Sequence, residues 1–230
     1  MKNLNQYILE SLKGYKPSAI KPKKQLPENC KRYFFAKEVN VDKIENLNTS
    51  KVTNMESMFE QANFDLDSLD LSSWDVSNVK NMGSMFADCE SLEALDLSSW
   101  DTSKVTNMKS MFDGCRHLKY LDLSGWDTSN MCKFSTVYTF GGCYDLDDIR
   151  FGPDWFNSKD TVSLNLSTCG KYKGYKLSDE TYESMLTMYD REKAGLGPVT
   201  IYFNENHNIP DGFKEKMKER GYETRIFSLK

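Results

Sequence analysis

The sequence predicts an α/β solenoid, in which each coil is a short strand, a turn, a short helix and a return. Three observations predict it. First, the segment Leu-Asp-Leu-Ser-x-Trp-Asp begins at Leu69, Leu95 and Leu121, which are 26 residues apart. Second, a Val-x-x-Met-x-x-Met-Phe segment recurs with the same period, ending at Phe86 and Phe112. Third, a hydrophobic content of 39% and an aromatic content of 13% can fill a core. A fixed period of this length is typical of repeat proteins whose coils stack on one another.

The strand of each coil is predicted from leucine spacing. Leu92, Leu95 and Leu97 follow a Leu-x-x-Leu-x-Leu pattern that ends in alternation, as in a strand with one buried face. Because stacked strands lie about 5 Å apart, residues 26 apart in the chain are expected to become neighbours along one column. The three tryptophans Trp74, Trp100 and Trp126 should therefore share a column.

The helix of each coil is predicted from a second spacing. Apolar residues of one unit recur at intervals of three or four, at Val105, Met108, Met111 and Phe112. This spacing favours a short helix or helical turn with one buried face. Asp101 or Ser103 is placed to cap its first turn.

Three segments are expected along the chain. Residues 1–29 combine an amphipathic N-terminal helix with a linker that holds Pro17, Pro22 and Pro27 among lysines. Residues 30–157 form the repeat solenoid, with a degraded fourth unit from Asp127 to Trp155. Residues 158–230 are expected to cap the solenoid with larger strand–helix units of the same kind, because a terminal coil needs its core covered.

The elements of the capping segment follow from local patterns. Residues 162–166 alternate as a strand, and Ser178 precedes an acidic helix start. Residues 199–203 alternate as a second strand after Pro198, and a second helix begins at Pro210 and ends at Gly221. Residues 222–229 should form the last strand.

Charge and composition limit the classes of partner. Removing the five lysines of residues 13–24 from the net charge of −4 leaves −9 for the rest of the chain. An acidic body argues against nucleic acid as the main partner, since phosphate binding needs clustered lysine and arginine. No apolar run reaches the length of a membrane helix, and the N-terminus is too polar for a secretion signal. We therefore expect no membrane span and a location in the cytoplasm of the producing cell.

Cysteine and histidine give little sign of catalysis or cofactor binding. The six cysteines form no Cys-x-x-Cys pair. Cys89, Cys115 and Cys143 hold one position of successive units and are interpreted as small buried residues and not as metal ligands. The two histidines, His117 and His207, have no nucleophile arranged beside them in the sequence. We expect no cofactor, no metal and no catalytic site.

Two columns of aspartate are the candidate polar features of the repeat. Asp70, Asp96 and Asp122 lie between inward leucines and should point outward from the strands. The same outward face is expected to carry Ser72, Ser98, Ser124 and Tyr120. Stacked carboxylates repel one another, so this column indicates hydrogen bonds between coils, a bound cation or a basic partner. A second column, at Asp75, Asp101 and Asp127, is interpreted as turn chemistry.

The repeat, with its Trp-Asp-x-Ser-x-Val and Met-x-x-Met-Phe elements, resembles that of the BspA-like leucine-rich-repeat surface proteins. The resemblance covers residues 47–155 and implies a leucine-rich-repeat-like fold with a binding or adhesion role and no catalytic activity. Members occur in bacterial surface lipoproteins and in gut phage proteins. This chain departs from the surface members in having few repeats and neither a visible secretion signal nor an anchor.

The N-terminus carries a second resemblance. Ile8-Leu9-Glu10 is similar to the tripeptide after which a prohead protease cuts the capsid-targeting peptides of T-even-like phages, which would place cleavage between Glu10 and Ser11. Three functions therefore stand as hypotheses. The first is a protein-interaction or adhesion module that presents its strand face to a partner with a basic surface. The second is a phage virion-associated or packaged structural protein, and the third is an enzyme near Glu205 and His207.

Overall fold

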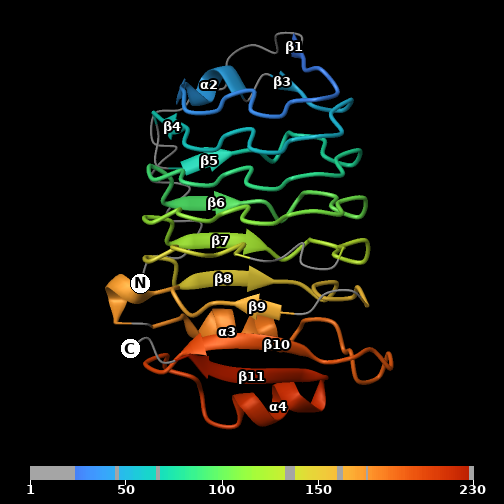
Figure 1. Ribbon diagram of the computed structural model, residues 1–230, viewed down its shortest axis with the longest axis vertical. Helices are drawn as coiled ribbons and strands as arrows, with labels where there is room; N and C mark the ends of the chain where they lie inside the picture. Colours follow the sequence, from blue (N-terminus) through green and yellow to red (C-terminus); the bar gives the residue numbers. More distant parts are fainter. Residues whose placement is uncertain are drawn as a thin grey trace.

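A computed structural model of the chain describes residues 24–44, 47–65, 68–132, 138–159, 163–174 and 176–227. These residues form a parallel β-solenoid, in which flattened coils stack along one axis and a strand–helix cap closes the C-terminal end (Figure 1). Every strand pair is parallel, as expected when each strand belongs to a successive coil. The prediction of a solenoid is confirmed.

One side of the solenoid, which we call the strand side, is a four-stranded sheet. Its strands in order are β5 (Ser68–Asp70), β6 (Ala94–Asp96), β7 (Tyr120–Leu123) and β8 (Asp148–Phe151). Leu69, Leu95, Leu121 and Ile149 pair in register and are buried. The repeat period thus fixes the strand register, because a slip would turn these apolar side chains to solvent.

Trp100, Trp126 and Trp155 stack in one column, as predicted for the first two. Trp74 makes the equivalent indole-to-backbone bond, to the carbonyl oxygen of Ile44 at 3.2 Å, but its ring packs 5.8 Å from Phe59. The ring centroids of Trp100 and Trp126 are 6.4 Å apart and the rings are nearly parallel. The indole N–H of Trp126 donates to the carbonyl oxygen of Leu97 in the preceding coil at 2.9 Å, and that of Trp100 donates to Leu71 at 3.1 Å. The buried indoles of Trp100 and Trp126 therefore pack against their neighbours and satisfy their donors across the coil boundary.

The opposite side, which we call the turn side, holds no helix where the sequence predicted one. Residues 108–115 form a series of tight turns, as do the matching residues 55–62 and 82–89. Each such segment contains residues in the left-handed region four positions apart, for example Ser84 (φ 53°) and Asp88 (φ 55°). A right-handed helix cannot contain such residues. The prediction of strand–helix coils is therefore wrong for the repeat segment.

The hydrogen bonds explain why turns replace a helix. Every second N–H donates to the next coil, as from Ser84 to Lys109 O at 2.8 Å, and the N–H groups between them close turns within the coil. The two sides of a straight stack must advance by the same distance, and strands advance by about 4.8 Å per coil. A helix is about 10 Å wide and cannot stack at that spacing. The Val-x-x-Met-x-x-Met-Phe pattern instead places methionine and phenylalanine on the inner face of stacked turns.

Phenylalanine rings form the core column of the turn side. The centroids of Phe86 lie 5.5 Å from Phe59 and 5.8 Å from Phe112, with both ring pairs nearly parallel. All three rings are fully buried. The column extends to Phe34 in the first coil and Phe140 in the fourth unit.

The first coils carry shorter elements. β1 (Lys24–Gln25) pairs with β3 (Leu47–Asn48), and β2 (Glu38–Val39) pairs with β4 (Asn63–Phe64). Between β2 and β3 in the sequence, the short helix α2 (Val41–Ile44) buries Val41 and Ile44 in the core.

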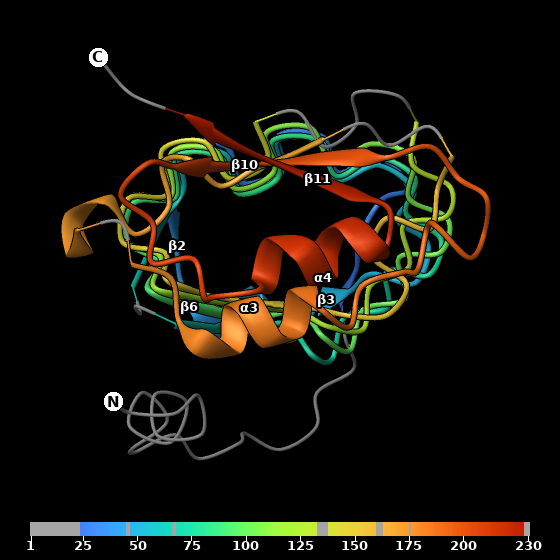
Figure 2. The ribbon, with the colours of Figure 1, turned by 90° about the horizontal axis from the view of Figure 1, so that it is seen from below.

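The cap differs between the two sides of the stack. On the turn side, β9 (Ser163–Asn165), β10 (Val199–Asn204) and β11 (Tyr222–Phe227) form a three-stranded parallel sheet. On the strand side, α3 (Asp179–Met185) replaces the next strand beside β8 (Figure 2). The 3₁₀-helix η1 (Lys171–Lys173) precedes α3, and α4 (Phe213–Glu219) packs behind β10 and β11. The two predicted strand–helix units of this segment are present, with Ser178 capping α3 through Thr181 N–H at 3.0 Å.

Candidate functional site

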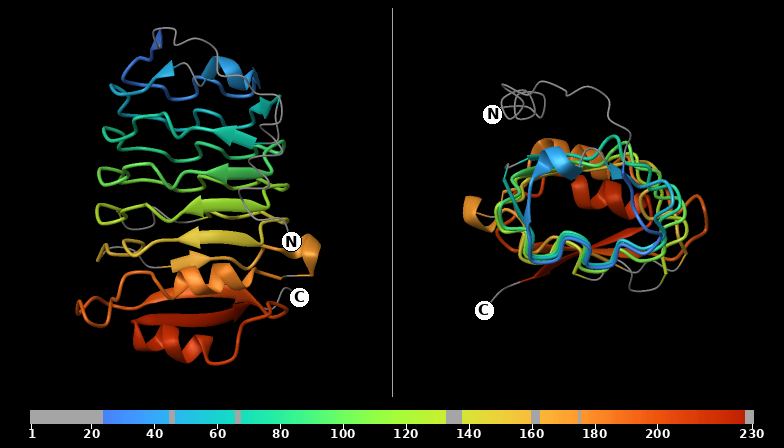
Figure 3. Two further views of the ribbon diagram at one scale, coloured as in Figure 1. Left: turned by 180° about the vertical axis from the view of Figure 1, so that it is seen from behind. Right: turned by 90° about the horizontal axis from the view of Figure 1, so that it is seen from above.

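The aspartates of the first column lie on the strand side, one per strand. Asp70, Asp96 and Asp122 pair in register across β5, β6 and β7. Asp70 is exposed, and Asp96 and Asp122 are half-buried. The strands run straight across the face seen from behind in Figure 3, so the column follows the long axis of the molecule. The predicted outward column is therefore present.

One oxygen of each aspartate serves the local turn. Oδ1 of Asp70, Asp96 and Asp122 accepts the backbone N–H of the serine two residues later, at 2.8 to 2.9 Å. These serines are Ser72, Ser98 and Ser124. The hydroxyl of Ser98 also donates to Asp96 Oδ1 at 2.7 Å. The bonds hold the chain as it leaves each strand, which is the turn role typical of aspartate.

The second oxygen of these carboxylates is used less. Asp122 Oδ2 accepts the Tyr120 hydroxyl at 3.0 Å. For Asp70 and Asp96, the hydrogen bonds found among the described residues all end on Oδ1. Every hydrogen bond of these carboxylates among the described residues goes to a group of the same coil, so the coil-to-coil hydrogen bonding that the sequence left open does not account for this column.

Tyr120 does not present its ring to a partner as expected. Its side chain is only 6% exposed, and it lies in register between Ala94 and Asp148. Burial and the neighbouring Asp122 carboxylate both raise the pKa of its hydroxyl well above the usual value. The small side chain of Ala94 leaves room for the ring to lie down on the sheet. Tyr120 therefore positions Asp122 and contributes little surface of its own.

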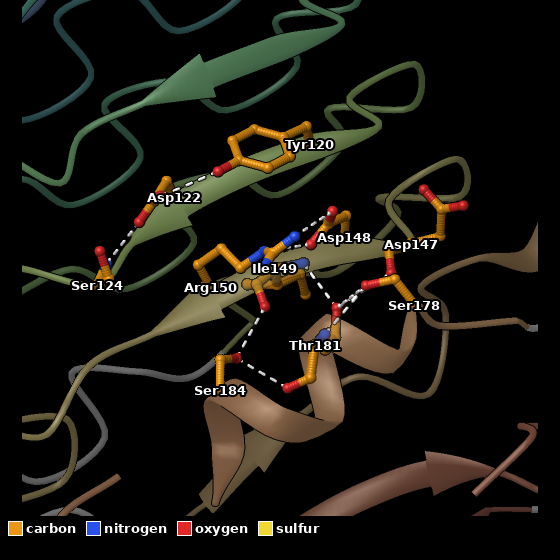
Figure 4. Close-up of polar contacts among 10 residues, drawn as sticks. All are labelled: Tyr120, Asp122, Ser124, Asp147, Asp148, Ile149, Arg150, Ser178, Thr181 and Ser184. Atoms are coloured by element: carbon orange, nitrogen blue, oxygen red, sulfur yellow. Dashed lines mark hydrogen bonds and ion pairs between the residues drawn. The ribbon is translucent and has the colours of Figure 1, made fainter. Parts of the chain in front are cut away.

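On the last strand of the sheet, the position that follows the aspartate column is occupied by an arginine. Arg150 stands beside Asp122 in the register of β7 and β8. Its Nε and Nη2 atoms donate to the two carboxylate oxygens of Asp148 at 2.7 and 2.9 Å, so its charge is held in a bidentate pair (Figure 4). Beside this pair lies an open depression of about 370 Å³. Its charged lining is Asp122, Arg150, Glu180 and Glu183.

The wall of the depression is α3, which is fixed to the edge of β8 by short polar side chains. The Thr181 hydroxyl accepts the N–H of Ile149 at 2.8 Å and donates to the carbonyl oxygen of Asp147 at 3.1 Å. The Ser184 hydroxyl donates to the carbonyl oxygen of Ile149 at 3.1 Å (Figure 4). These bonds replace those that a further strand would make, and they set Glu180 and Glu183 beside the end of the aspartate column.

The polar ladder on the turn side behaves differently. Asn54, Asn81 and Asn107 are bridged in register. Asn107 Nδ2 donates to Asn81 Oδ1 at 2.9 Å, and Asn81 Nδ2 donates to Glu56 at 3.1 Å. These side chains therefore satisfy one another from coil to coil.

The second aspartate column has the turn role that was predicted. Asp75, Asp101 and Asp127 each accept the backbone N–H of the residue two positions later, at 2.8 to 3.1 Å. The hydrogen bonds from Ser77, aided by Lys104, hold the pKa of Asp75 below its ordinary value. This column therefore matches the first in local chemistry and differs from it in position.

The cysteine column is buried. The thiols of Cys89, Cys115 and Cys143 each donate to the carbonyl oxygen of a phenylalanine in the preceding coil at 3.0 Å. Burial raises the pKa of Cys115 to about 12. Neutral thiols of this kind are poor metal ligands and poor nucleophiles. Within the described ranges, no group of three or more potential ligands is arranged to hold a metal ion.

The histidines are placed in different settings. His207 is buried, its Nδ1 accepts the N–H of Asn204 at 3.2 Å, and its Nε2 lies 3.0 Å from the carbonyl oxygen of Cys169. Desolvation lowers the pKa of His207, which favours the neutral ring, and both ring nitrogens face backbone groups. A hollow lined by Glu205, His207 and Glu215 lies at the cap. His117 is exposed and sits 3.2 Å from Asp145.

Several residues of this site were missed from the sequence. Arg150 and Asp148 occupy the strand of the degraded fourth unit, and aligning Leu146-Asp147-Asp148-Ile149-Arg150-Phe151 with Leu118–Leu123 would have placed Arg150 beside Asp122. Glu180 and Glu183 carry no repeat signal, because they belong to the cap. The predicted processing site at Glu10 and Ser11 lies outside the described residues.

Comparison with known proteins defines a class. The chain is a repeat protein with a parallel solenoid fold, and residues 28–147, just over half of its length, match the family described as Mycoplasma protein of unknown function, DUF285. The chain belongs to this DUF285 family. Neither the curated protein sequences nor the solved structures contain a match. Over the part of the chain that the structure describes, no helix is long and apolar enough to span a membrane.

Proposed function

We propose that this chain is a non-enzymatic protein-interaction module whose binding surface is the strand side. The surface runs along Asp70, Asp96 and Asp122 and ends at the depression beside Arg150 and α3. The observation that carries the proposal is the aspartate column itself. Its carboxylates lie one strand apart, and among the described residues each bonds only to groups of its own coil.

The charges of this surface favour a basic partner. Stacked carboxylates about 5 Å apart raise one another's energy, by about 1 kcal/mol per pair in water. Lysine or arginine side chains spaced along an extended segment would relieve that repulsion. Glu180 and Glu183 extend the negative charge past the end of the sheet, whereas Arg150 is neutralised by Asp148. Complementary charge of this kind raises the association rate and selects among partners.

The second aspartate column supplies a matched control for the experiment. Asparagine retains an Oδ1 acceptor for the turn, so Asp96→Asn with Asp122→Asn removes two charges and keeps the local structure. Asp75→Asn with Asp101→Asn makes the same change at the turns of the other column. Both double variants change the net charge equally.

The test is a peptide array of lysine- and arginine-containing segments probed with the purified chain, followed by affinity measurement on the best binders. We expect the Asp96/Asp122 variant to lose about tenfold or more in affinity and the Asp75/Asp101 variant to lose less than about twofold. Equal loss in both variants would show only a general charge effect. Unchanged binding by the Asp96/Asp122 variant would remove the strand side as the surface.

A further inference from the structure

The last strand of the cap has a free edge. The N–H groups of Val199 and Glu205 donate to the carbonyl oxygens of Gly221 and Phe227, so the odd-numbered residues of β11 face β10. The N–H and C=O groups of Tyr222, Thr224 and Ile226 therefore point away from β10. Seen from below, no described element lies across this edge (Figure 2). Such an edge is a template for pairing with another strand.

The side chains of this strand also indicate an interface. Ile226 is 45% exposed and Phe227 is 48% exposed, so the end of the strand presents one large apolar side chain to solvent on each of its two faces. Glu223 and Arg225 alternate with the edge residues and carry opposite charges. They form an exposed pair at 3.4 Å within one strand. Exposed pairs of this kind contribute little to stability, so both groups are free to exchange partners.

We propose that β11 pairs antiparallel with β11 of a second copy of this chain, about a two-fold axis at Thr224. In this register Thr224 lies opposite itself, Tyr222 lies opposite Ile226, and Glu223 lies opposite Arg225 of the second copy. The three residues with free backbone groups then form the hydrogen-bonded pairs of the antiparallel ladder. The charged residues form the close non-bonded pairs, with each glutamate facing an arginine.

Neighbouring registers lack this match. Centring the axis on Glu223 places two glutamates opposite each other, and centring it on Arg225 does the same for the arginines. Like charges directly opposite one another destabilise a strand pair. Among the registers centred on residues 223 to 225, the charge pattern of β11 thus selects one for self-pairing.

Strand length favours a second copy docked at this end over head-to-tail stacking. β11 has six residues, whereas β1 and β2 in the first coils have two residues each. A head-to-tail contact would leave most of the β11 edge unpaired, but a second β11 pairs its whole length. The contact is also two-fold and closes on itself, as in most homodimers. This surface lies at the cap and is independent of the strand side.

The first test is charge reversal. Sedimentation equilibrium should show a mass that rises from 26.6 kDa toward twice that value at concentrations of about 0.1–1 mM, since a single strand pair is a small interface. Glu223→Arg alone and Arg225→Glu alone should each weaken dimerisation about tenfold or more. An equimolar mixture of the two single variants should restore it, because every cross-strand pair is then opposite in charge. A constant mass of 26.6 kDa for the unaltered chain to about 1 mM would overturn the proposal, as would failure of the mixture to associate.

The second test fixes the register. Thr224→Cys in a Cys132→Ser background should form an intermolecular disulfide on mild oxidation, because hydrogen-bonded antiparallel pairs have Cα atoms about 5.5 Å apart. Ile226→Cys in the same background should not, since Ile226 lies opposite Tyr222 and not opposite itself. Equal crosslinking of both variants, or crosslinking of Ile226→Cys alone, would reject this register. Thermal melting of every variant verifies that the chain is folded.

Discussion

The repeat body and the C-terminal cap enclose the same continuous apolar core with different backbone structures. In the body, the strand side and the turn side both advance by one strand spacing per coil, and both are built from extended or tightly turned chain. In the cap, the turn side continues as β9, β10 and β11, but the strand side switches to α3. A helix is allowed there because no further coil stacks beyond it at strand spacing. The comparison teaches that coil spacing, and not local apolar periodicity, decides where helices occur in this chain.

The largest expected effect tests the columns of the body. Phe86→Ala should lower the free energy of unfolding by about 3–5 kcal/mol, because the ring packs between Phe59 and Phe112 and leaves a cavity shared by two neighbouring coils. Tyr138→Ala, at a side chain that is 60% exposed, should change stability by less than about 0.5 kcal/mol. Denaturant unfolding of both variants measures the difference. If Phe86→Ala lowered the free energy of unfolding only slightly, the phenylalanine column would not be a main source of the core's stability.

The next effect tests the join between body and cap. Thr181→Val should destabilise the chain by about 1–3 kcal/mol, because the buried N–H of Ile149 loses its acceptor. The carbonyl oxygen of Asp147 loses one of its two donors and keeps the N–H of Ser178. Thr187→Val removes a hydroxyl from an exposed residue of the segment that follows α3 and should cost less. The free energies of unfolding are compared by urea denaturation. Equal costs would show that α3 does not terminate the sheet through Thr181.

A smaller effect tests the tight turns of the body. Gly114 has φ +77°, and a Cβ atom there would lie 2.1 Å from Asp88 Oδ1 in the preceding coil. Gly114→Ala should therefore cost about 1–2 kcal/mol from the left-handed backbone alone, and more from the contact. Gly197→Ala in the cap, where the added Cβ meets nothing within 4 Å, is the matched control. Thermal unfolding should separate the two variants by several degrees.

The last effect is absent at neutral pH and concerns stability at alkaline pH. Burial raises the pKa of Cys30 to about 11 and of Cys115 to about 12, so the folded chain keeps protons that the unfolded chain loses near pH 9. Stability contributed by these thiols is present below pH 9 and is lost as pH rises toward 12. At pH 8, a thiol reagent should modify the exposed Cys132 quickly and the five buried cysteines only after unfolding. Rapid reaction of Cys115 in the folded chain would contradict the buried column.

Much of the fold could be predicted from the sequence, because the 26-residue period determines which residues share a column. Trp100 and Trp126, the leucine strands and the phenylalanine column all follow from it. The turns at residues 108–115 could not be distinguished from a helix, because apolar residues spaced three or four positions apart are compatible with both structures. Local pattern does not contain the coil spacing that decides between them. The cap elements could be predicted because single residues mark their ends. Ser178 precedes α3, Pro198 precedes β10 and Gly221 follows α4.

The candidate site was only partly predictable. The outward direction of Asp70, Asp96 and Asp122 follows from strand alternation. The burial of Tyr120 does not, because it depends on the small Ala94 beside it in the preceding strand. Arg150 and the α3 carboxylates were missed because they lie where the repeat degrades and the cap begins.

The central claim is that the turn side stacks at strand spacing along the whole body. Its most direct test is the double variant Asn81→Cys with Asn107→Cys, in a Cys132→Ser background. The two positions are bridged in register, and their side chains now touch at 2.9 Å. Mild oxidation should give an intramolecular disulfide, identified by mass spectrometry of the linked peptides, because bridged neighbours lie within the Cα separation that disulfides require. Failure to form that disulfide in the folded chain would mean that the coils are separated by a helix width of about 10 Å, and the structure described for the body would be wrong.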